Sequence, residues 1–159
     1  MIASALDQVL SVDQTAQVAV LVTDDNTVQR LNYEYRGIDE VTDVLSFSAD
    51  HPGHWEGSDE VPEDRLTASN ATDEALPFTL PPDELPTLGE VIISYPQTQR
   101  QSRVQAQSLT MTEEEALKRE LALLLVHGVL HLVGHDHIEY GQTTDMQAKE
   151  QAALAPIFE

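Results

Sequence analysis

Four of the chain's six histidines stand within residues 127–137, in the segment VHGVLHLVGHDHIEY (Val126–Tyr140). His127 and His131 are four residues apart, so on a helix their side chains lie on the same face, one turn apart. Two imidazoles placed in this way can bind one metal ion, and the H-x-x-x-H spacing is typical of half of a zinc site. We therefore predict a metal site with these two histidines among its ligands.

The third ligand must come from the residues that follow, where His135 and His137 are the candidates. On a continued helix, His135 would lie about 12 Å along the axis from His127, too far for both rings to reach one ion. If the chain turns at Gly134 instead, it can bring His137 back towards the pair, as in the metzincin pattern. We predict that His127, His131 and His137 bind the metal, and that His135 is either exposed or in contact with a ligand.

Gly128 bears on the reaction that such a site could catalyse. Three histidines leave a fourth coordination position for water, which is typical of catalytic zinc, although Asp136 could close that position. The chain has no cysteine, so all ligands must be imidazoles or carboxylates. Zinc proteases carry a general-base glutamate directly after the first histidine, where this chain has Gly128. Glycine cannot accept a proton, so the site favours a substrate such as a phosphodiester over a peptide. Because Gly128 has no side chain, it also allows another element to pack close to the helix.

The elements expected around this segment form a small α+β domain with a mixed sheet. From their β-branched or alternating residues, strands are expected at 17–22, 43–48 and 88–94. Helices are expected at 27–35, from Pro96 to about residue 107, at 112–134, and at 144–155, the last closed by Pro156. Thr112 and Glu115 match a capping box at the start of the histidine-bearing helix.

The composition limits the possible environments and partners. With 159 residues, the chain (1–159) can form one domain with its own core. Its formal net charge of −20 argues against nonspecific binding to nucleic acid, and no DNA partner is expected. Residues 50–86 contain ten acidic residues and one arginine, so we interpret residues 49–86 as an acidic surface insertion; adaptation to high salt is a second explanation of the acidity. Without a signal-peptide pattern or an apolar stretch that could span a bilayer, a cytoplasmic protein with no membrane partner is expected.

Arg36 precedes Gly37 at a predicted break between helix and loop, where its guanidinium group could bind a phosphate. Together, the segments LNYEYRGIDEVTDVLSF, LGEVIIS and HGVLHLVGHDH resemble, in order, the signature blocks of the YbeY family of bacterial endoribonucleases. Asp43 and Glu90 depart from these blocks, which usually have asparagine and aspartate there. The resemblance covers most of the chain outside residues 49–86.

The resemblance implies a zinc-dependent endoribonuclease that cleaves single-stranded RNA during ribosomal RNA maturation, at the 3′ end of 16S RNA on the ribosomal small subunit, and that acts in ribosome quality control. It implies a mixed four-stranded sheet flanked by helices, with a metzincin-like zinc-binding helix and turn. One Zn²⁺ ion is expected on His127, His131 and His137, with Arg36 and His127 as catalytic residues. The ion would lower the pKa of a bound water and polarise a phosphoryl oxygen, and Arg36 would orient the phosphate.

Two alternatives stand beside this hypothesis: a ribosome-associated factor whose zinc is structural, and a metal-dependent hydrolase of other substrates. Imidazole ligands also accept nickel, copper and iron. No residue stands out as a general base, and Glu120 is expected to be a solvated helix residue. Arg100 and Arg103, one helical turn apart, either guide the RNA backbone or belong to a solvated face.

Overall fold

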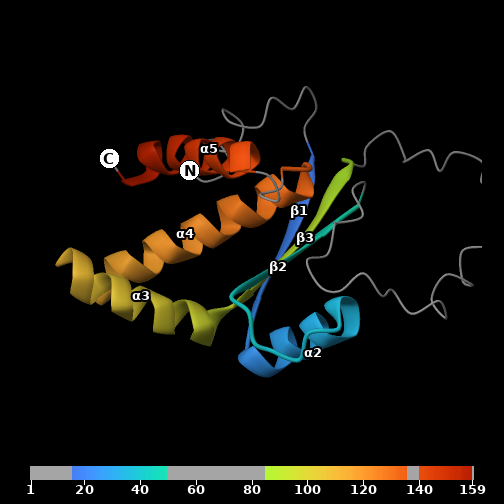
Figure 1. Ribbon diagram of the computed structural model, residues 1–159, viewed down its shortest axis with the longest axis horizontal. Helices are drawn as coiled ribbons and strands as arrows, with labels where there is room; N and C mark the ends of the chain where they lie inside the picture. Colours follow the sequence, from blue (N-terminus) through green and yellow to red (C-terminus); the bar gives the residue numbers. More distant parts are fainter. Residues whose placement is uncertain (1–15, 50–84, 136–139, 159) are drawn as a thin grey trace, which may run out of the picture.

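The computed structural model of the chain describes residues 16–49, 85–135 and 140–158. In chain order these residues form strand β1 (Gln17–Thr23), helix α2 (Asp25–Arg36), strands β2 (Val44–Ser48) and β3 (Thr87–Ser94), and helices α3 (Tyr95–Leu109), α4 (Glu113–Leu132) and α5 (Tyr140–Phe158) (Figure 1). Each of these elements was predicted from the sequence, with bounds that differ by four residues at most. The α+β class is therefore confirmed.

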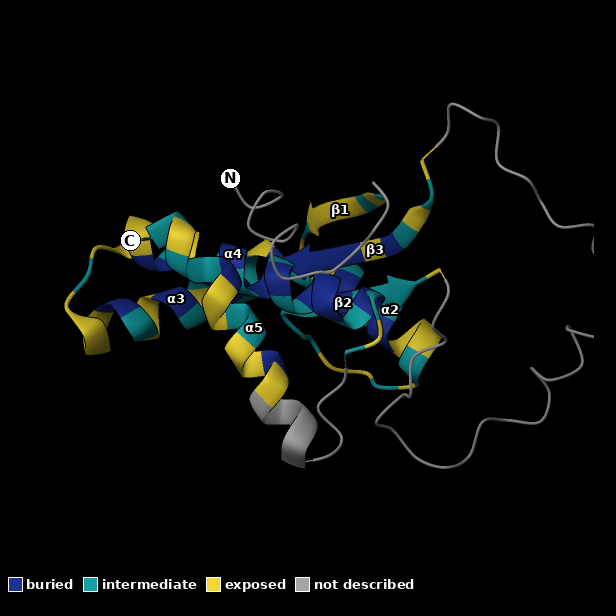
Figure 2. Ribbon diagram, turned by 90° about the horizontal axis from the view of Figure 1, so that it is seen from above, coloured by how far each residue is buried: buried dark blue, intermediate teal, exposed yellow. Residues whose placement is uncertain are grey.

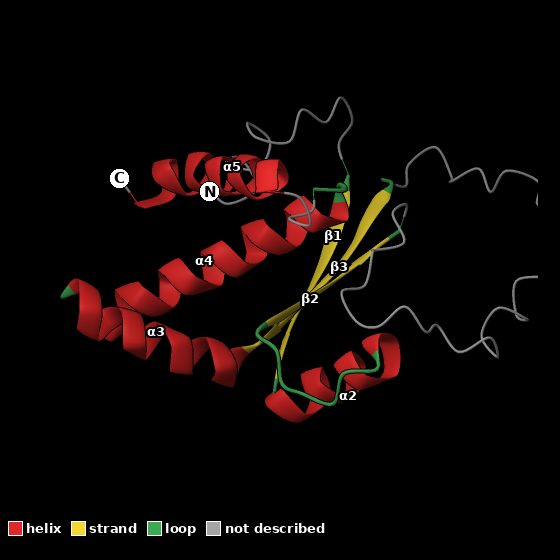
Figure 3. Cartoon of the chain, in the orientation of Figure 1, coloured by secondary structure: helices red, strands yellow, loops and turns green. Residues whose placement is uncertain are grey.

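The three strands form one mixed sheet in the order β1-β3-β2 (Figure 3). The central strand, β3, runs parallel to β1 and antiparallel to β2, which places β1 and β2 at the two edges. The predicted mixed sheet is confirmed, with three strands among the described residues; the expected fourth strand is not among them.

The two faces of the sheet carry different helices. Side chains alternate between the faces of a strand, so neighbouring residues of β3 enter different clusters. Val91 and Ile93 pack with buried residues of α4 and α5, whereas Ile92 packs with Val28 of α2 and Leu45 of β2. Helix α2 accordingly lies on the side of the sheet away from α4 and α5 (Figure 1). Burial is concentrated along β3 and the second half of α4, whereas β1 is largely exposed (Figure 2).

Both ends of α4 are stabilised by local hydrogen bonds that the sequence predicts. At the start, the Thr112 hydroxyl accepts from the Glu115 backbone N–H, and the Glu115 carboxylate accepts from the Thr112 N–H, which confirms the capping box. At the end, the His135 N–H donates to the Leu130 carbonyl and the Gly134 N–H donates to the His131 carbonyl. This is a Schellman motif, and Gly134 has the positive φ of 86° that it requires. The predicted end of the helix at Gly134 is confirmed.

The backbone of α4 lies close to the sheet at Gly128. A β-carbon on this residue would stand 2.6 Å from Val91 Cγ1 and 3.0 Å from Ser46 Oγ. Val91 is fully buried, so it cannot move aside at low cost. The expected close packing at this glycine is confirmed, and the same contact leaves no room for a glutamate side chain.

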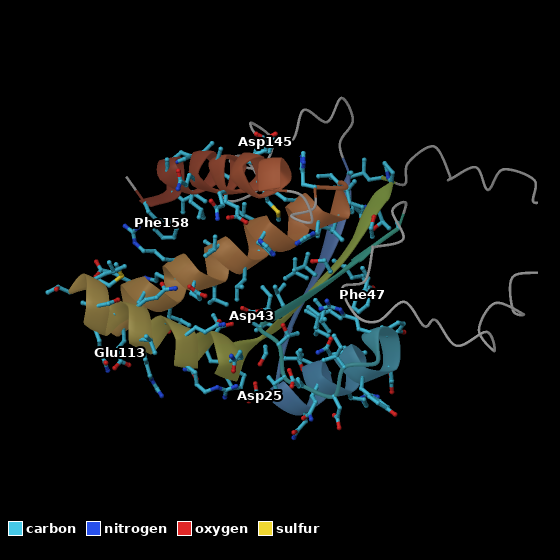
Figure 4. All side chains as sticks on the ribbon, viewed as in Figure 1. Asp25, Asp43, Phe47, Glu113, Asp145 and Phe158 are labelled. Atoms are coloured by element: carbon cyan, nitrogen blue, oxygen red, sulfur yellow. The ribbon has the colours of Figure 1, made fainter. Side chains whose placement is uncertain are left out.

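The end of the chain differs from its prediction. Pro156 was expected to close the last helix, but it lies inside α5, which continues to Phe158. Ala153 is fully buried in the core, and the Arg119 guanidinium lies 4.8 Å from the centre of the Phe158 ring (Figure 4). These tertiary contacts hold the last turn in place although proline lacks the N–H that an internal helical residue would donate. None of the described helices is long and apolar enough to cross a membrane.

The chain enters and leaves the acidic segment at neighbouring strands. The Ala49 N–H, just after β2, donates to the Leu88 carbonyl of β3 at 3.0 Å. The Ser48 hydroxyl donates to the Leu132 carbonyl at 2.9 Å, so this end of the sheet lies beside the last turn of α4. Residues 50–84 of the predicted insertion lie outside the described residues.

Glu120 is buried, so the expectation of a solvated helix residue is wrong. Only 6% of the residue is exposed, and its carboxylate accepts from the Gln105 side chain of α3. Asp43, at the start of β2, receives a similar bond of 2.9 Å from Gln101 of the same helix. Burial, and secondarily the charge of Asp43, raises the pKa of Glu120, while the Gln105 bond lowers it. Two acidic groups, Glu120 of α4 and Asp43 just before β2, thus accept hydrogen bonds from side chains one turn apart on α3.

Gly128→Ala is expected to lower the free energy of unfolding by about 1–3 kcal/mol, the usual cost of inserting a methyl group into a filled core. At an exposed helical site the same substitution would stabilise by about 1 kcal/mol. The direction of the change in a urea-unfolding midpoint therefore tests the contact. The matched control is Val91→Ala, which removes the methyl groups in question: in that background Gly128→Ala should cost less, and an equal cost would contradict the explanation.

Glu120→Gln is expected to stabilise the protein at neutral pH. Because its pKa is raised in the folded state, the Glu120 carboxyl favours folding fully below its ordinary value of 4.5, and this contribution is lost as the pH rises through the raised pKa. Glutamine keeps a carbonyl for Gln105 and carries no charge, so the advantage of the variant should shrink as the pH falls towards 4.5. Denaturant unfolding of the parent and the variant, from neutral pH down to pH 4.5, measures this difference in stability.

The control is Glu114→Gln, at an exposed carboxyl whose pKa is lowered by a hydrogen bond from Lys118. Its contribution to stability is present above the ordinary pKa, so this substitution should be slightly unfavourable at neutral pH. A Glu120→Gln protein less stable than the parent at neutral pH would contradict the effect of burial.

Candidate metal centre

The structure brings His127 and His131 together on α4. Their Nε2 atoms are 3.1 Å apart, and the ring planes meet at 77°. Two imidazole nitrogens on one tetrahedral zinc ion stand about 3.3 Å apart, given Zn–N distances of about 2.0–2.1 Å. The two nitrogen atoms are therefore already at the separation that a shared ion requires.

The pair lies at the border of the hydrophobic core. Val126, Val129 and Leu130, interleaved with the histidines along α4, are at most 2% exposed. The side chain of His127 is 29% exposed, which leaves it accessible while its backbone is fixed by the buried neighbours. Such an arrangement holds polar rings in defined positions without placing them in the apolar interior.

Glu150 of α5 contacts the other nitrogen of His127. Its Oε1 lies 2.7 Å from His127 Nδ1, and its side chain is only 14% exposed. Met146 and Ala153, one turn to either side of Glu150, are buried in the core and dock α5 against α4. The sequence reasoning missed Glu150 because it lies 23 residues from its partner. The one available signal was its place between two apolar residues at helical spacing.

His135 is engaged by the neighbouring residue of α5. The Lys149 ammonium lies 2.7 Å from His135 Nε2, so it can donate to the lone pair of that nitrogen. Burial, followed by the charge of Lys149, lowers the pKa of His135, and Asp145 opposes this shift. The half-buried His135 ring thus directs a ring nitrogen at a cation of its own chain.

The third predicted ligand, His137, lies outside the described residues, as does Asp136. Within residues 16–49, 85–135 and 140–158, no group of three His, Cys, Asp or Glu side chains is arranged to hold a metal ion. The described part of the predicted site is therefore the histidine pair, to which the structure adds the carboxylate of Glu150.

Arg36 is the last residue of α2, and Gly37 ends this helix with a φ of 71°. Tyr35, its neighbour, packs its ring against Phe47 of β2, with centroids 5.0 Å apart. Since β2 is an edge strand with α2 on one face and α4 on the other, Arg36 and the histidine pair start from opposite faces of the sheet. The loop after Gly37 leads to this same edge strand.

The other arginines considered for RNA binding are paired with carboxylates. Arg100 bonds Asp25 at 2.8 Å, at the end of the sheet where β3 passes into α3 (Figure 4). The Ser94 hydroxyl also donates to Asp25, and these two contacts lower the pKa of that carboxyl. Arg103 lies 3.7 Å from Glu113. Of the two interpretations, the geometry favours the surface role over guidance of an RNA backbone.

A family model and the curated relatives of this sequence agree on one family. A family model described as endoribonuclease YbeY matches residues 1–157. A protein of that name from Dehalococcoides mccartyi is 37% identical over 158 residues, which cover 99% of this chain and 78% of that protein. Another from Roseiflexus castenholzii is 38% identical, with 96% and 79% covered. The solution structure of TM1509 from Thermotoga maritima aligns with a TM-score of 0.49 at 17% identity, covering 98% of this chain and 81% of that one. The chain belongs to the endoribonuclease YbeY family.

Proposed function

We propose that this chain is an endoribonuclease of ribosomal RNA processing that cleaves single-stranded RNA at one Zn²⁺ ion, held by His127, His131 and His137. Membership of the family supports the class of reaction. The observation that carries the metal site is the 3.1 Å separation of the Nε2 atoms of His127 and His131. The donor set suits zinc because imidazole nitrogens are among its preferred ligands.

Two contacts support His137 over His135 as the third ligand. The Schellman motif reverses the chain at Gly134, immediately after the last turn of α4. His137 follows three residues later, in reach of a turn that resembles the metzincin arrangement. The Nε2 atom of His135, by contrast, faces the Lys149 ammonium, a group that competes with a metal ion for the same lone pair.

The chain's own groups then divide the work on a phosphodiester. A divalent ion held by the three histidines would supply polarisation of a phosphoryl oxygen and a lowered pKa for bound water. Arg36 supplies a guanidinium fork that orients the phosphate and neutralises charge that develops in the transition state. Gly128 contributes no base, and its contact with Val91 leaves no space for one. This disfavours the peptide-hydrolase alternative.

RNA recognition cannot depend on a broad basic surface. The chain has eight lysines and arginines against a formal net charge of −20. In the described part of the chain, most of these cations contact other groups of the protein: Arg30, Arg100, Arg103 and Lys118 lie beside carboxylates, Arg119 over Phe158, and Lys149 beside His135. We therefore propose that the partner is a defined single-stranded site, the 3′ end of 16S RNA on the small subunit, rather than RNA in general.

The outer edge of β1 supports the proposed fourth strand. This edge has no strand partner among the described residues, and Val20, Leu21 and Val22 are each about half exposed. An uncovered apolar edge strand readily pairs with a further strand.

Removing the metal is expected to abolish cleavage without unfolding the protein. The core around Val126, Val129 and Leu130 packs against the sheet independently of the histidine rings, which supports a catalytic rather than a structural ion. The measurement is cleavage of a labelled 16S RNA 3′ fragment and circular dichroism, both before and after chelation, with activity restored by Zn²⁺. Unfolding on chelation would instead favour the structural-zinc alternative.

His131→Ala is the matched variant. Substituting a residue that hydrogen-bonds to a metal ligand usually lowers activity by roughly 10–100-fold, and removing the ligand itself should lower it further. Equal cleavage by the parent and this variant would indicate a contaminating nuclease.

Arg36→Ala is expected to reduce kcat by about 10²–10³-fold, the usual effect of removing one group that stabilises transition-state charge. Arg36→Lys keeps the charge but loses the planar fork, so it should recover part of this loss. The control is Arg103→Ala, at a largely exposed arginine beside Glu113, which should leave cleavage unchanged. Equal losses for Arg36→Ala and Arg103→Ala would contradict a specific role for Arg36.

A further inference from the structure

We propose that Glu150 is a positioning residue: it holds the proton of the His127 ring on Nδ1 and fixes the orientation of the ring, so that Nε2 is the nitrogen that binds the metal ion. The inference rests on the proposed function, and it assigns to α5 a part of the site that the histidine motif does not contain. Its basis is the 2.7 Å contact between Glu150 Oε1 and His127 Nδ1.

The contact determines which ring nitrogen carries the proton. An ionised carboxylate only accepts hydrogen bonds, so the bond requires a proton on His127 Nδ1. In a neutral ring this leaves an unprotonated Nε2, the atom that faces His131 Nε2 at 3.1 Å. The carboxylate also makes the imidazole a more basic ligand.

The surroundings of Glu150 distinguish it from an ordinary surface carboxylate. With a side chain only 14% exposed, it has given up most of its hydration, which is costly unless a partner compensates. Met146 and Ala153 hold this part of α5 against the core, at 3% and 0% exposure. The packing of α5 against the core therefore holds Glu150 beside His127.

Lys149, the residue before Glu150, contacts a second histidine, His135, through the opposite kind of hydrogen bond. Lys149 donates to the Nε2 of His135, whereas Glu150 accepts from the Nδ1 of His127. The contact with Lys149 occupies the Nε2 lone pair of His135, whereas the contact with Glu150 engages only Nδ1 of His127. Two consecutive residues of α5 thus favour His127 as a metal ligand and disfavour His135.

A simple structural ion pair is the competing explanation. In that case His127 would be an imidazolium ion, with protons on both nitrogens, and Glu150 would contribute only to stability. The two explanations differ in the state of Nε2 and in the effect of Glu150 on metal affinity, so a comparison of stabilities alone cannot separate them.

The experiment measures Zn²⁺ affinity of the full chain by competition with a chelating dye. Glu150→Ala should bind Zn²⁺ about 10–100-fold more weakly than the parent. Glu150→Gln, which keeps the shape and a neutral acceptor, should recover part of that loss. The control is Glu114→Gln, which removes the same charge from an exposed site near the opposite end of α4 and should leave the affinity unchanged.

A second measurement reads the His127 ring directly in the metal-free protein. Long-range ¹H–¹⁵N spectra should show His127 protonated at Nδ1 and unprotonated at Nε2 in the parent, and this preference should be lost in Glu150→Ala. If the parent binds Zn²⁺ and both Glu150 variants bind it equally well, the inference is overturned and the proposed function stands. A parent that binds no Zn²⁺ would overturn both.

Discussion

The contact between α4 and the sheet at Gly128 is the constraint on which the site depends. Because residue 128 has no side chain, the helix backbone approaches Val91 and Ser46 directly. That approach fixes the rotation of α4 about its axis, and with it the direction of His127, the preceding residue. The same lack of space removes the position from which a zinc protease presents its base. Packing and chemical selectivity therefore have one cause.

Helix α5 supplies the charged groups that contact the histidines of α4. Helix α4 alone presents two imidazoles on one face, and the carboxylate that contacts Nδ1 of His127 comes from α5. The docking of Met146 and Ala153 brings Lys149 and Glu150 to the histidine segment, so hydrophobic packing determines which charged groups contact His127 and His135. A metal site that is assembled in this way depends on the register between α4 and α5 as much as on the spacing of its ligands.

What the sequence predicted well was local. The capping box at Thr112, the turn at Gly134 and the four-residue histidine spacing each depend on residues within one or two helical turns, and each lies where it was expected. The contacts that were missed join distant parts of the chain. The burial of Glu120 is not visible in the local sequence because its partner, Gln105, belongs to another helix, and no local pattern connects Glu150 with His127. Pro156 shows the same limit in reverse, since its local preference to end a helix is overridden by tertiary packing.

The acidity of the chain gives the proposed metal site an electrostatic role as well as a chemical one. A protein of net charge −20 repels a polyanion over most of its surface, and most of its cations already lie against groups of the chain. Three neutral imidazoles add no charge, so a divalent ion bound to them would be a concentrated positive charge in a negative field. The Glu150 carboxylate beside His127 would reduce the positive charge of such a site, but the sum of a divalent ion and one carboxylate would still be positive. Attraction of the phosphate would therefore be confined to the place where the ion and Arg36 can act on it, and a surface that is unfavourable to RNA elsewhere would favour binding at that position.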